Sequence, residues 1–237
     1  MHLSTYQSEL DAIQHASEQL KRIFESFQDQ PLLFLSSGGS VLALLEYIPQ
    51  NLLSKRLTVS TLDDRFSHKP SANTFAQLSA TSFFERAKAA GARVIDTTPQ
   101  MNETLEQFGR RIDATFKQWQ QEHETGVVAA TMGMGADGHT SGIMPYPNEP
   151  EEFDALFCRT DAWVVGYNAG NKNEIPDRAT TTIPFLTGHV RHAVMLIMGK
   201  EKKSAFERLC AMEGSICKTP ARVVHDMNDV QIFTTLA

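Results

Sequence analysis

The sequence lacks the features that mark several large classes of protein. Its 237 residues contain no run of about 20 apolar residues, the length that a membrane-spanning helix needs. The segment Met1–Tyr6 has neither the charged start nor the apolar core of a signal peptide. The net charge is −6, and no run of Lys and Arg offsets this acidic balance, which argues against a nucleic-acid-binding surface. We therefore expect a cytoplasmic protein that has neither a membrane nor a nucleic acid as its partner.

Cysteine is scarce, and its spacing excludes two further classes. Cys158, Cys210 and Cys217 form no CxxC pair, so the sequence predicts free thiols in a reducing compartment rather than a disulfide framework or a zinc site. His189 and His192 make an H-x-x-H without an internal Glu or an evident third ligand. We expect a surface pair there and no metal site.

Two common active-site signatures find no support either. The strand–helix junction at Ser37–Ser40 is neither a Walker A sequence nor a GxGxxG fingerprint, so it does not indicate a nucleotide or dinucleotide cofactor. The chain has no G-x-S-x-G elbow, which leaves a serine nucleophile with little support.

What the sequence does contain is an alternation of short apolar runs with amphipathic segments. The predicted strands are residues 32–35, 57–61, 93–95, 127–131, 163–167, 193–198 and 230–233. The predicted helices are residues 6–27, 41–48, 75–84, 105–119 and 201–212. Such alternation favours an α/β fold with a doubly wound, mostly parallel sheet and helices on both faces. No linker divides residues 1–237, so one domain is expected, with a proline-rich surface loop at Pro145–Asp154.

A first glycine turn, Ser37-Gly38-Gly39-Ser40, lies between a predicted strand and a predicted helix. Free backbone N–H groups and the positive end of the helix dipole meet at such a junction and favour an anion. The serine hydroxyls offer further donors. A serine cap after a tight turn explains the same residues, and the sequence leaves both interpretations open.

A second glycine turn, Met132–Thr140, follows the buried strand at residues 127–131. Open α/β sheets bind ligands at the carboxyl ends of their strands, and glycines let the backbone approach a ligand closely. This turn carries Asp137 and His139, and histidine titrates in the range that suits proton transfer near neutrality. The segment is a candidate active-site loop, although a tight connection of no catalytic function fits the glycines equally well.

Cationic side chains recur at other predicted loops. Asp63-Asp64-Arg65 comes just after a strand, where acidic neighbours can hold a guanidinium towards a substrate oxygen. Arg178, and Lys202 one turn into a predicted helix, can add positive charge to the same cleft. A surface turn with local ion pairs and a solvated lysine are the alternatives.

Taken in order, these blocks resemble the superfamily of glucosamine-6-phosphate deaminases and 6-phosphogluconolactonases, and most closely its lactonase branch. The segment Met134-Gly135-Ala136-Asp137-Gly138-His139-Thr140-Ser141 is the most specific element. The other matching blocks are Ser37–Ser40, Asp63–Arg65 with Ser71 and Asn73, Pro145, Arg178–Thr182 and Gly199–Lys202. The resemblance implies a Rossmann-like fold of the sugar-phosphate isomerase/lactonase type.

The resemblance also implies an activity: cofactor-free hydrolysis of 6-phosphogluconolactone to 6-phosphogluconate in the pentose phosphate pathway. By the family pattern, His139 is the general base, Asp137 orients it, and Arg65 faces the substrate where charge builds on the lactone. A phosphosugar lactone is the expected small-molecule partner. The expected substrate- and phosphate-binding residues are Ser37, Gly38, Gly39, Ser40, Asp64, Asn73, Gly135, Arg178 and Lys202.

Two other functions remain as alternatives. Deaminases of the superfamily carry a glutamate shortly after the histidine, whereas Thr140–Pro145 contains no carboxylate, and Arg65 stands where they have an aromatic residue. A sugar-phosphate sensor would normally carry a DNA-binding helix-turn-helix, and the single helix before the first strand and the acidic net charge weigh against one. The lactonase pattern itself is broken at Val41-Leu42, where threonine or serine and then proline are common. The sequence leaves the oligomeric state open between a monomer and a small homo-oligomer.

Overall fold

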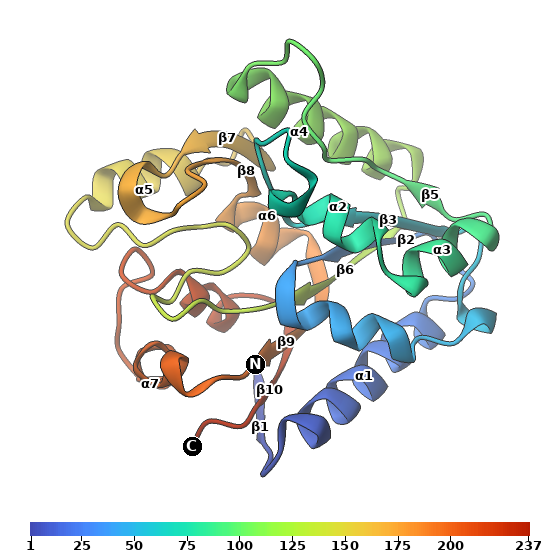
Figure 1. The fold of residues 1–237 in the computed structure, drawn as a ribbon, viewed down its shortest axis with the longest axis horizontal. Helices are drawn as coiled ribbons and strands as arrows, with labels where there is room; N and C mark the ends of the chain where they lie inside the picture. The colour runs from blue at the N-terminus through green and yellow to red at the C-terminus, as the bar shows by residue number, and fades with distance from the viewer.

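A seven-stranded parallel sheet forms the centre of the computed structural model, which describes residues 1–237 (Figure 1). The strand order is β1-β10-β9-β6-β2-β3-β5, and every pair within it is parallel. The strands are β1 (His2–Thr5), β2 (Leu32–Ser36), β3 (Leu57–Thr61), β5 (Arg93–Val94), β6 (Val127–Met132), β9 (Val190–Ile197) and β10 (Asp229–Thr234). The predicted doubly wound α/β fold is confirmed.

The sheet is buried on both faces because its apolar side chains alternate between two cores. In β2, Leu32 and Phe34 enter one core while Leu33 and Leu35 enter the other. The first core is closed by α1 (Glu9–Ser26), the 3₁₀ helix η1 (Gly39–Tyr47), α2 (Thr74–Ser79) and α3 (Ser82–Ala89). The second is closed by α4 (Leu105–Glu122), α5 (Pro150–Phe157), α6 (Ile183–Gly188) and α7 (Lys203–Cys210).

A second, three-stranded antiparallel sheet was not expected from the sequence. It consists of β4 (Asp63–Arg65), β8 (Asp177–Thr181) and β7 (Val164–Asn168), in that order. The predicted strand at residues 163–167 belongs to this sheet and not to the parallel one. Because Arg65 pairs with Arg178 in the ladder, the small sheet brings together two basic residues that are far apart in the sequence.

Several predicted boundaries are wrong, each for a local reason. The expected surface loop at 145–154 contains the first half of α5, which begins with Pro150 and has Glu151 and Glu152 in its first turn. The α-helix expected at 41–48 is the 3₁₀ helix η1. The helix expected at 75–84 is broken where Thr81 caps α3. The short polar strand β1 gave no apolar signal, and no helix has the length and apolar composition needed to span a membrane.

Helix α4 holds the small sheet in place through a contact between two glycines. A Cβ at Gly109 would lie 2.2 Å from the Gly166 nitrogen on β7, and a Cβ at Gly166 would lie 2.2 Å from the Leu105 carbonyl oxygen. The backbones of helix and strand therefore touch with no side chain between them. This close approach sets the position of β7 and, through it, of β8.

We expect Gly109→Ala to lower the free energy of unfolding by about 2 kcal/mol, because overpacking at a site that cannot relax costs ~1–3 kcal/mol. Alanine is otherwise the better helix former. Gly188→Ala on α6 is the matched control, since a Cβ there meets nothing within 4 Å. Urea unfolding measures both variants, and equal stabilities would contradict the proposed contact.

Candidate active site

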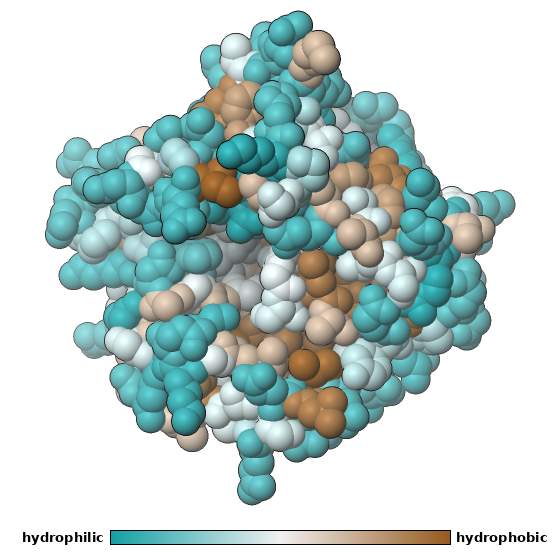
Figure 2. All heavy atoms as spheres, in the orientation of Figure 1, coloured by the Kyte–Doolittle hydropathy of each residue, from teal (hydrophilic) through white to brown (hydrophobic).

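The carboxyl ends of four strands of the parallel sheet meet at one edge. Ser37–Ser40 follow β2, Asp63 lies just beyond β3, Gly133–Gly142 follow β6, and Lys202 lies beyond β9. The chain leaves β2 and β6 towards opposite halves of the sheet, which makes this edge the topological switch point where such sheets bind ligands. Figure 2 shows this face hollowed near its centre, with weakly polar residues inside and hydrophilic residues around the rim.

A cavity of about 350 Å³ occupies this edge. It is lined by Ser37, Gly38, Gly39, Ser40, Asp63, Arg65, Gln77, Gly133, Met134, Gly135, His139, Ser141, Gly142, Arg178 and Lys202. Most of the predicted site residues are therefore gathered in one place. Asp137 adjoins the cavity through His139, whereas Asp64 and Asn73 are buried behind it and do not line it.

Asp137 and His139 form a hydrogen-bonded pair at the mouth of the cavity. The carboxylate Oδ1 lies 2.6 Å from the His139 Nδ1 and 3.0 Å from the His139 backbone nitrogen. A carboxylate only accepts, so Nδ1 carries the proton and Nε2 of the neutral ring keeps a free lone pair. Burial tends to raise the pKa of Asp137, but the hydrogen bond and charge of His139 outweigh it and hold that pKa below its ordinary value.

Glycine is required at position 135 because the histidine ring lies against its backbone. A Cβ at Gly135 would come within 2.2 Å of the His139 ring and 2.7 Å of the Asp137 carboxylate. The turn is closed by the Gly135 N–H, which donates to the His139 carbonyl at 2.9 Å. The His139 ring thus packs against the Gly135 backbone in the orientation in which its Nδ1 is hydrogen-bonded to Asp137.

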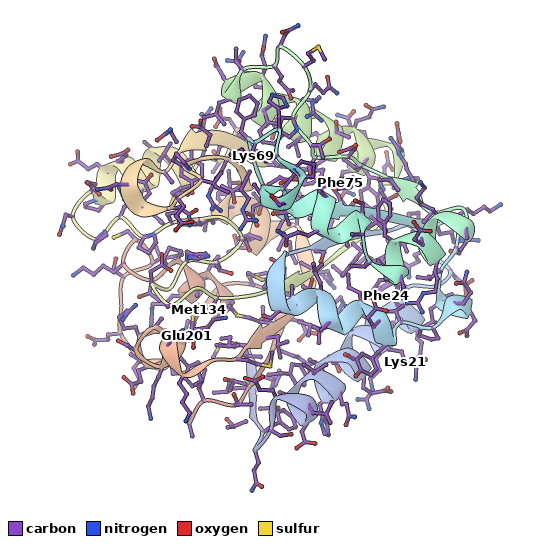
Figure 3. The ribbon with its side chains drawn as sticks, in the orientation of Figure 1. Lys21, Phe24, Lys69, Phe75, Met134 and Glu201 are labelled. Carbon is purple, nitrogen blue, oxygen red and sulfur yellow. The ribbon has the colours of Figure 1, made fainter.

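The segment around α7 supports this loop from outside. Arg208 donates to the Asp137 carbonyl at 3.0 Å, and the Ala221 N–H donates to the Gly138 carbonyl at 3.0 Å. Met134 on the loop after β6 and Lys202 just before α7 line the same cavity, and Figure 3 labels Met134 and the neighbouring Glu201 in this region. The position of the candidate base therefore depends on a part of the chain more than sixty residues away.

Two hydroxyls of the small sheet hold the end of the loop. Thr180 donates to the Ser141 carbonyl, and the buried Tyr167 hydroxyl donates to the Gly142 carbonyl. Burial raises the pKa of Tyr167, so it stays a neutral donor. Ser141 has a φ of +50°, a left-handed conformation that costs a side-chain-bearing residue about 1–3 kcal/mol and is maintained by such contacts. At Gly142 a Cβ would lie 2.5 Å from Asp63, so a side chain is excluded there.

Asp64 and Asn73 position Arg65 rather than facing the cavity. The Asp64 carboxylate accepts from the backbone N–H groups of Arg65, Thr74 and Phe75 and from the Thr97 hydroxyl, at 2.7–3.1 Å. The Asn73 amide donates to the Arg65 carbonyl at 3.2 Å. Burial raises the pKa of Asp64 to about 7 in spite of these hydrogen bonds. Asp64 therefore ties the start of α2 to the strand that carries Arg65.

The strand period explains why Asp63 was missed and Asp64 was chosen. Residues 63–65 form β4, in which alternate side chains share a face, so Asp63 and Arg65 point together into the cavity while Asp64 points away. Treating these residues as a turn hid that alternation. Gln77 was missed because a single glutamine on a short helix carries no sequence signal.

Positive charge predominates in the cavity. Arg65, Arg178 and Lys202 line it against one carboxylate, Asp63. The Arg178 guanidinium is 2% exposed, and it is held by the Asn173 side chain at 2.8 Å and by Asp63 at 3.5 Å. Lys202 makes no salt bridge and ends the 3₁₀ turn η5 (Lys200–Lys202), which follows Gly199 and runs directly into α7. An anionic ligand would balance this excess.

The turn after β2 adds backbone donors to these cations. Gly39 has a φ of +72°, and the 3₁₀ helix η1 begins there. Neither the Gly38 nor the Ser40 N–H donates to another protein group, whereas the Gly39 N–H donates to the Gln77 Oε1 at 3.3 Å. The turn therefore offers unpaired donors beside Lys202 and Arg178, although a 3₁₀ helix replaces the expected α-helix.

Comparison with known proteins gives concordant matches. The family described as glucosamine-6-phosphate isomerases/6-phosphogluconolactonase matches residues 7–233. The 6-phosphogluconolactonase of Pseudomonas aeruginosa is 33% identical over 124 residues, and the matched part covers 52% of this chain and about half (49%) of that protein. The solved 6-phosphogluconolactonase from Trypanosoma brucei has a TM-score of 0.76 at 16% identity, covering 98% of this chain and 95% of its own.

A deaminase shares the architecture as well. The solved structure of a monomeric glucosamine-6-phosphate deaminase has a TM-score of 0.74 at 18% identity and covers 99% of this chain and 97% of its own. At such identities the solved structures establish the fold and not the reaction.

The raised pKa of Asp64 predicts a pH-dependent stability. The pKa of Asp in an unfolded chain is about 3.9. Between pH ~4 and ~7 the folded protein therefore holds a proton on Asp64 that the unfolded chain does not. The stabilisation from the protonated carboxyl is complete below pH ~4 and is lost as the pH rises through ~7. We expect the difference in free energy of unfolding between wild type and Asp64→Asn to fall over this range in urea titrations. A ¹³C carboxyl titration of the wild type is a direct check, and an Asp64 midpoint below pH 5 would contradict the prediction.

Proposed function

The chain belongs to the family of glucosamine-6-phosphate isomerases and 6-phosphogluconolactonases, and we propose that it hydrolyses 6-phosphogluconolactone to 6-phosphogluconate. The observation that carries the proposal is the Asp137–His139 pair, which presents a free imidazole nitrogen to a cavity rich in cations and backbone donors. Hydrolysis of this lactone needs a base that activates water, and binding of this substrate needs donors for its phosphate group. The cavity offers both. It supports the lactonase step of the pentose phosphate pathway.

In the proposed mechanism, His139 Nε2 takes a proton from a water molecule as its oxygen attacks the lactone carbonyl carbon. The carbonyl π electrons move to oxygen and give a tetrahedral oxyanion. When the carbonyl re-forms, the bond to the ring oxygen breaks, and the imidazolium returns its proton to that leaving oxygen. Asp137 stabilises the imidazolium and keeps Nδ1 protonated throughout, because its lowered pKa leaves it a carboxylate. No second acid is required.

Arg65 is the proposed partner of the oxyanion. Its backbone is fixed by Asp64 and Asn73, its Nη1 donates to the Ala72 carbonyl at 3.2 Å, and its Nε has no protein partner. A buried N–H without a partner is costly unless a ligand completes it. A preorganised guanidinium beside the reacting carbonyl stabilises charge that develops only in the transition state.

The phosphate of the substrate is proposed to lie against the turn after β2. Ser40 and the free backbone N–H groups of Gly38 and Ser40 supply donors, and Lys202 and Arg178 supply charge. In this proposal the phosphate lies at the turn after β2, and the lactone carbonyl lies at the Asp137–His139 pair on the loop after β6.

The deaminase alternative lacks its distinguishing group in this cavity. Residues 140–145 form the loop after His139, and none of them is a carboxylate that could take part in opening a sugar ring. A deaminase assay on glucosamine 6-phosphate is nevertheless the next experiment if lactonase activity is absent.

We expect His139→Ala to lower the lactonase rate by at least about a hundredfold, because a general base contributes ~10²–10⁴-fold. Binding of 6-phosphogluconate should persist, since the phosphate contacts are unchanged. His15→Ala on the exposed face of α1 is the control. The assay uses freshly generated lactone and subtracts spontaneous hydrolysis. A variant as fast as the wild type would exclude His139 as the base.

Lys202→Ala should raise KM for the phosphorylated lactone by about 10–100-fold with little change in kcat, because a hydrogen bond to a charged group is worth ~1.5–3 kcal/mol. Hydrolysis of glucono-1,5-lactone, which has no phosphate, should not change. Lys203→Ala removes an exposed neighbouring lysine that does not line the cavity and should behave as the wild type. Equal effects on both substrates would contradict a phosphate role.

A further inference from the structure

One polar side chain of the cavity has no part in the mechanism above. Gln77 lies on α2 and enters the cavity next to the turn after β2. Its Oε1 accepts the Gly39 N–H at 3.3 Å, and a Cβ at Gly38 would lie only 3.0 Å from that oxygen. The amide group therefore rests directly against the backbone of the proposed phosphate site.

The hydrogen bond to Gly39 determines which way the amide faces. Because Oε1 accepts from the turn, Nε2 is the other in-plane substituent of the amide carbon and points away from the Gly39 N–H. No protein group accepts from Nε2, so its two N–H donors are free at the cavity. Hydrogen bonds at its first turn fix the position of α2, and with it the position of Gln77. The Asp64 carboxylate accepts from the Thr74 and Phe75 N–H groups, and Asn73 caps the helix.

We propose that Gln77 is a specificity-determining residue that donates from Nε2 to the phosphate held at the Ser37–Ser40 turn. This inference rests on the proposed function and adds a contact to it. Beside three cations, a neutral amide adds a directional hydrogen bond without adding charge. It therefore favours a tetrahedral anion that places an oxygen within reach of Nε2. The Gly39 hydrogen bond keeps the amide oriented before the ligand arrives, which avoids the cost of ordering it on binding.

The test uses Gln77→Glu and Gln77→Ala. The glutamate variant keeps an oxygen for the Gly39 N–H but replaces the donor with a negative charge facing the phosphate. We expect it to weaken 6-phosphogluconate binding at least about tenfold in calorimetry, and the alanine variant to weaken it about three- to tenfold. Gln14→Glu, on the exposed face of α1, changes the net charge equally and should bind as the wild type.

Kinetics separate this role from a structural one. Both variants should raise KM for 6-phosphogluconolactone with little change in kcat and leave hydrolysis of glucono-1,5-lactone at the wild-type rate. The inference is overturned if Gln77→Glu binds 6-phosphogluconate as the wild type does, or if both substrates are affected equally. A wild type that binds 6-phosphogluconate but hydrolyses no lactone would contradict the proposed function alone. A wild type that binds neither 6-phosphogluconate nor inorganic phosphate would overturn the phosphate site and this inference together.

Discussion

Burial of the parallel sheet on both faces is the constraint from which the site follows. The inner strands bury apolar side chains on both faces, so crossover helices cover both faces and all seven strands run in one direction. The chain then leaves every strand at the same edge. The chain leaves β2 and β6 towards opposite halves of the sheet, and the cavity at this edge is lined by the two turns together with residues of α2, β4 and β8 and Lys202. The candidate active site is thus a consequence of how the core is closed.

The small antiparallel sheet converts that open edge into a cavity. The Gly109–Gly166 contact seats β7 against α4, and β8 pairs with β7 and brings in Arg178 and Thr180. Thr180 and Tyr167 then hold the carbonyls of Ser141 and Gly142, which end the loop that carries His139. The loop that carries the candidate base is consequently supported by packing in a different layer of the molecule.

The two carboxyl groups next to the candidate reactive residues differ in their surroundings and in the direction of their pKa shifts. Asp64 is surrounded by donors and serves to anchor Arg65 and α2, at the cost of a pKa raised by burial. Asp137, half-exposed and paired with His139, keeps a lowered pKa and remains an anion. The pKa values of these two carboxyl groups are thus shifted in opposite directions, and the difference is set by solvent access and by which groups surround each one.

Sequence patterns predict the α/β class, the two glycine turns and the candidate residues Asp137 and His139, because apolar runs and glycines at strand ends are properties of neighbouring positions. The family resemblance was needed to assign roles to Arg65, Arg178 and Lys202. The second sheet, the assignment of Asp63 and not Asp64 to the cavity, and the presence of Gln77 beside Gly39 depended on contacts between distant segments. Strand pairing and helix packing decide which face of a short element meets the site, and no neighbouring residue encodes that choice. These features therefore follow from the packing of the folded chain and not from local sequence.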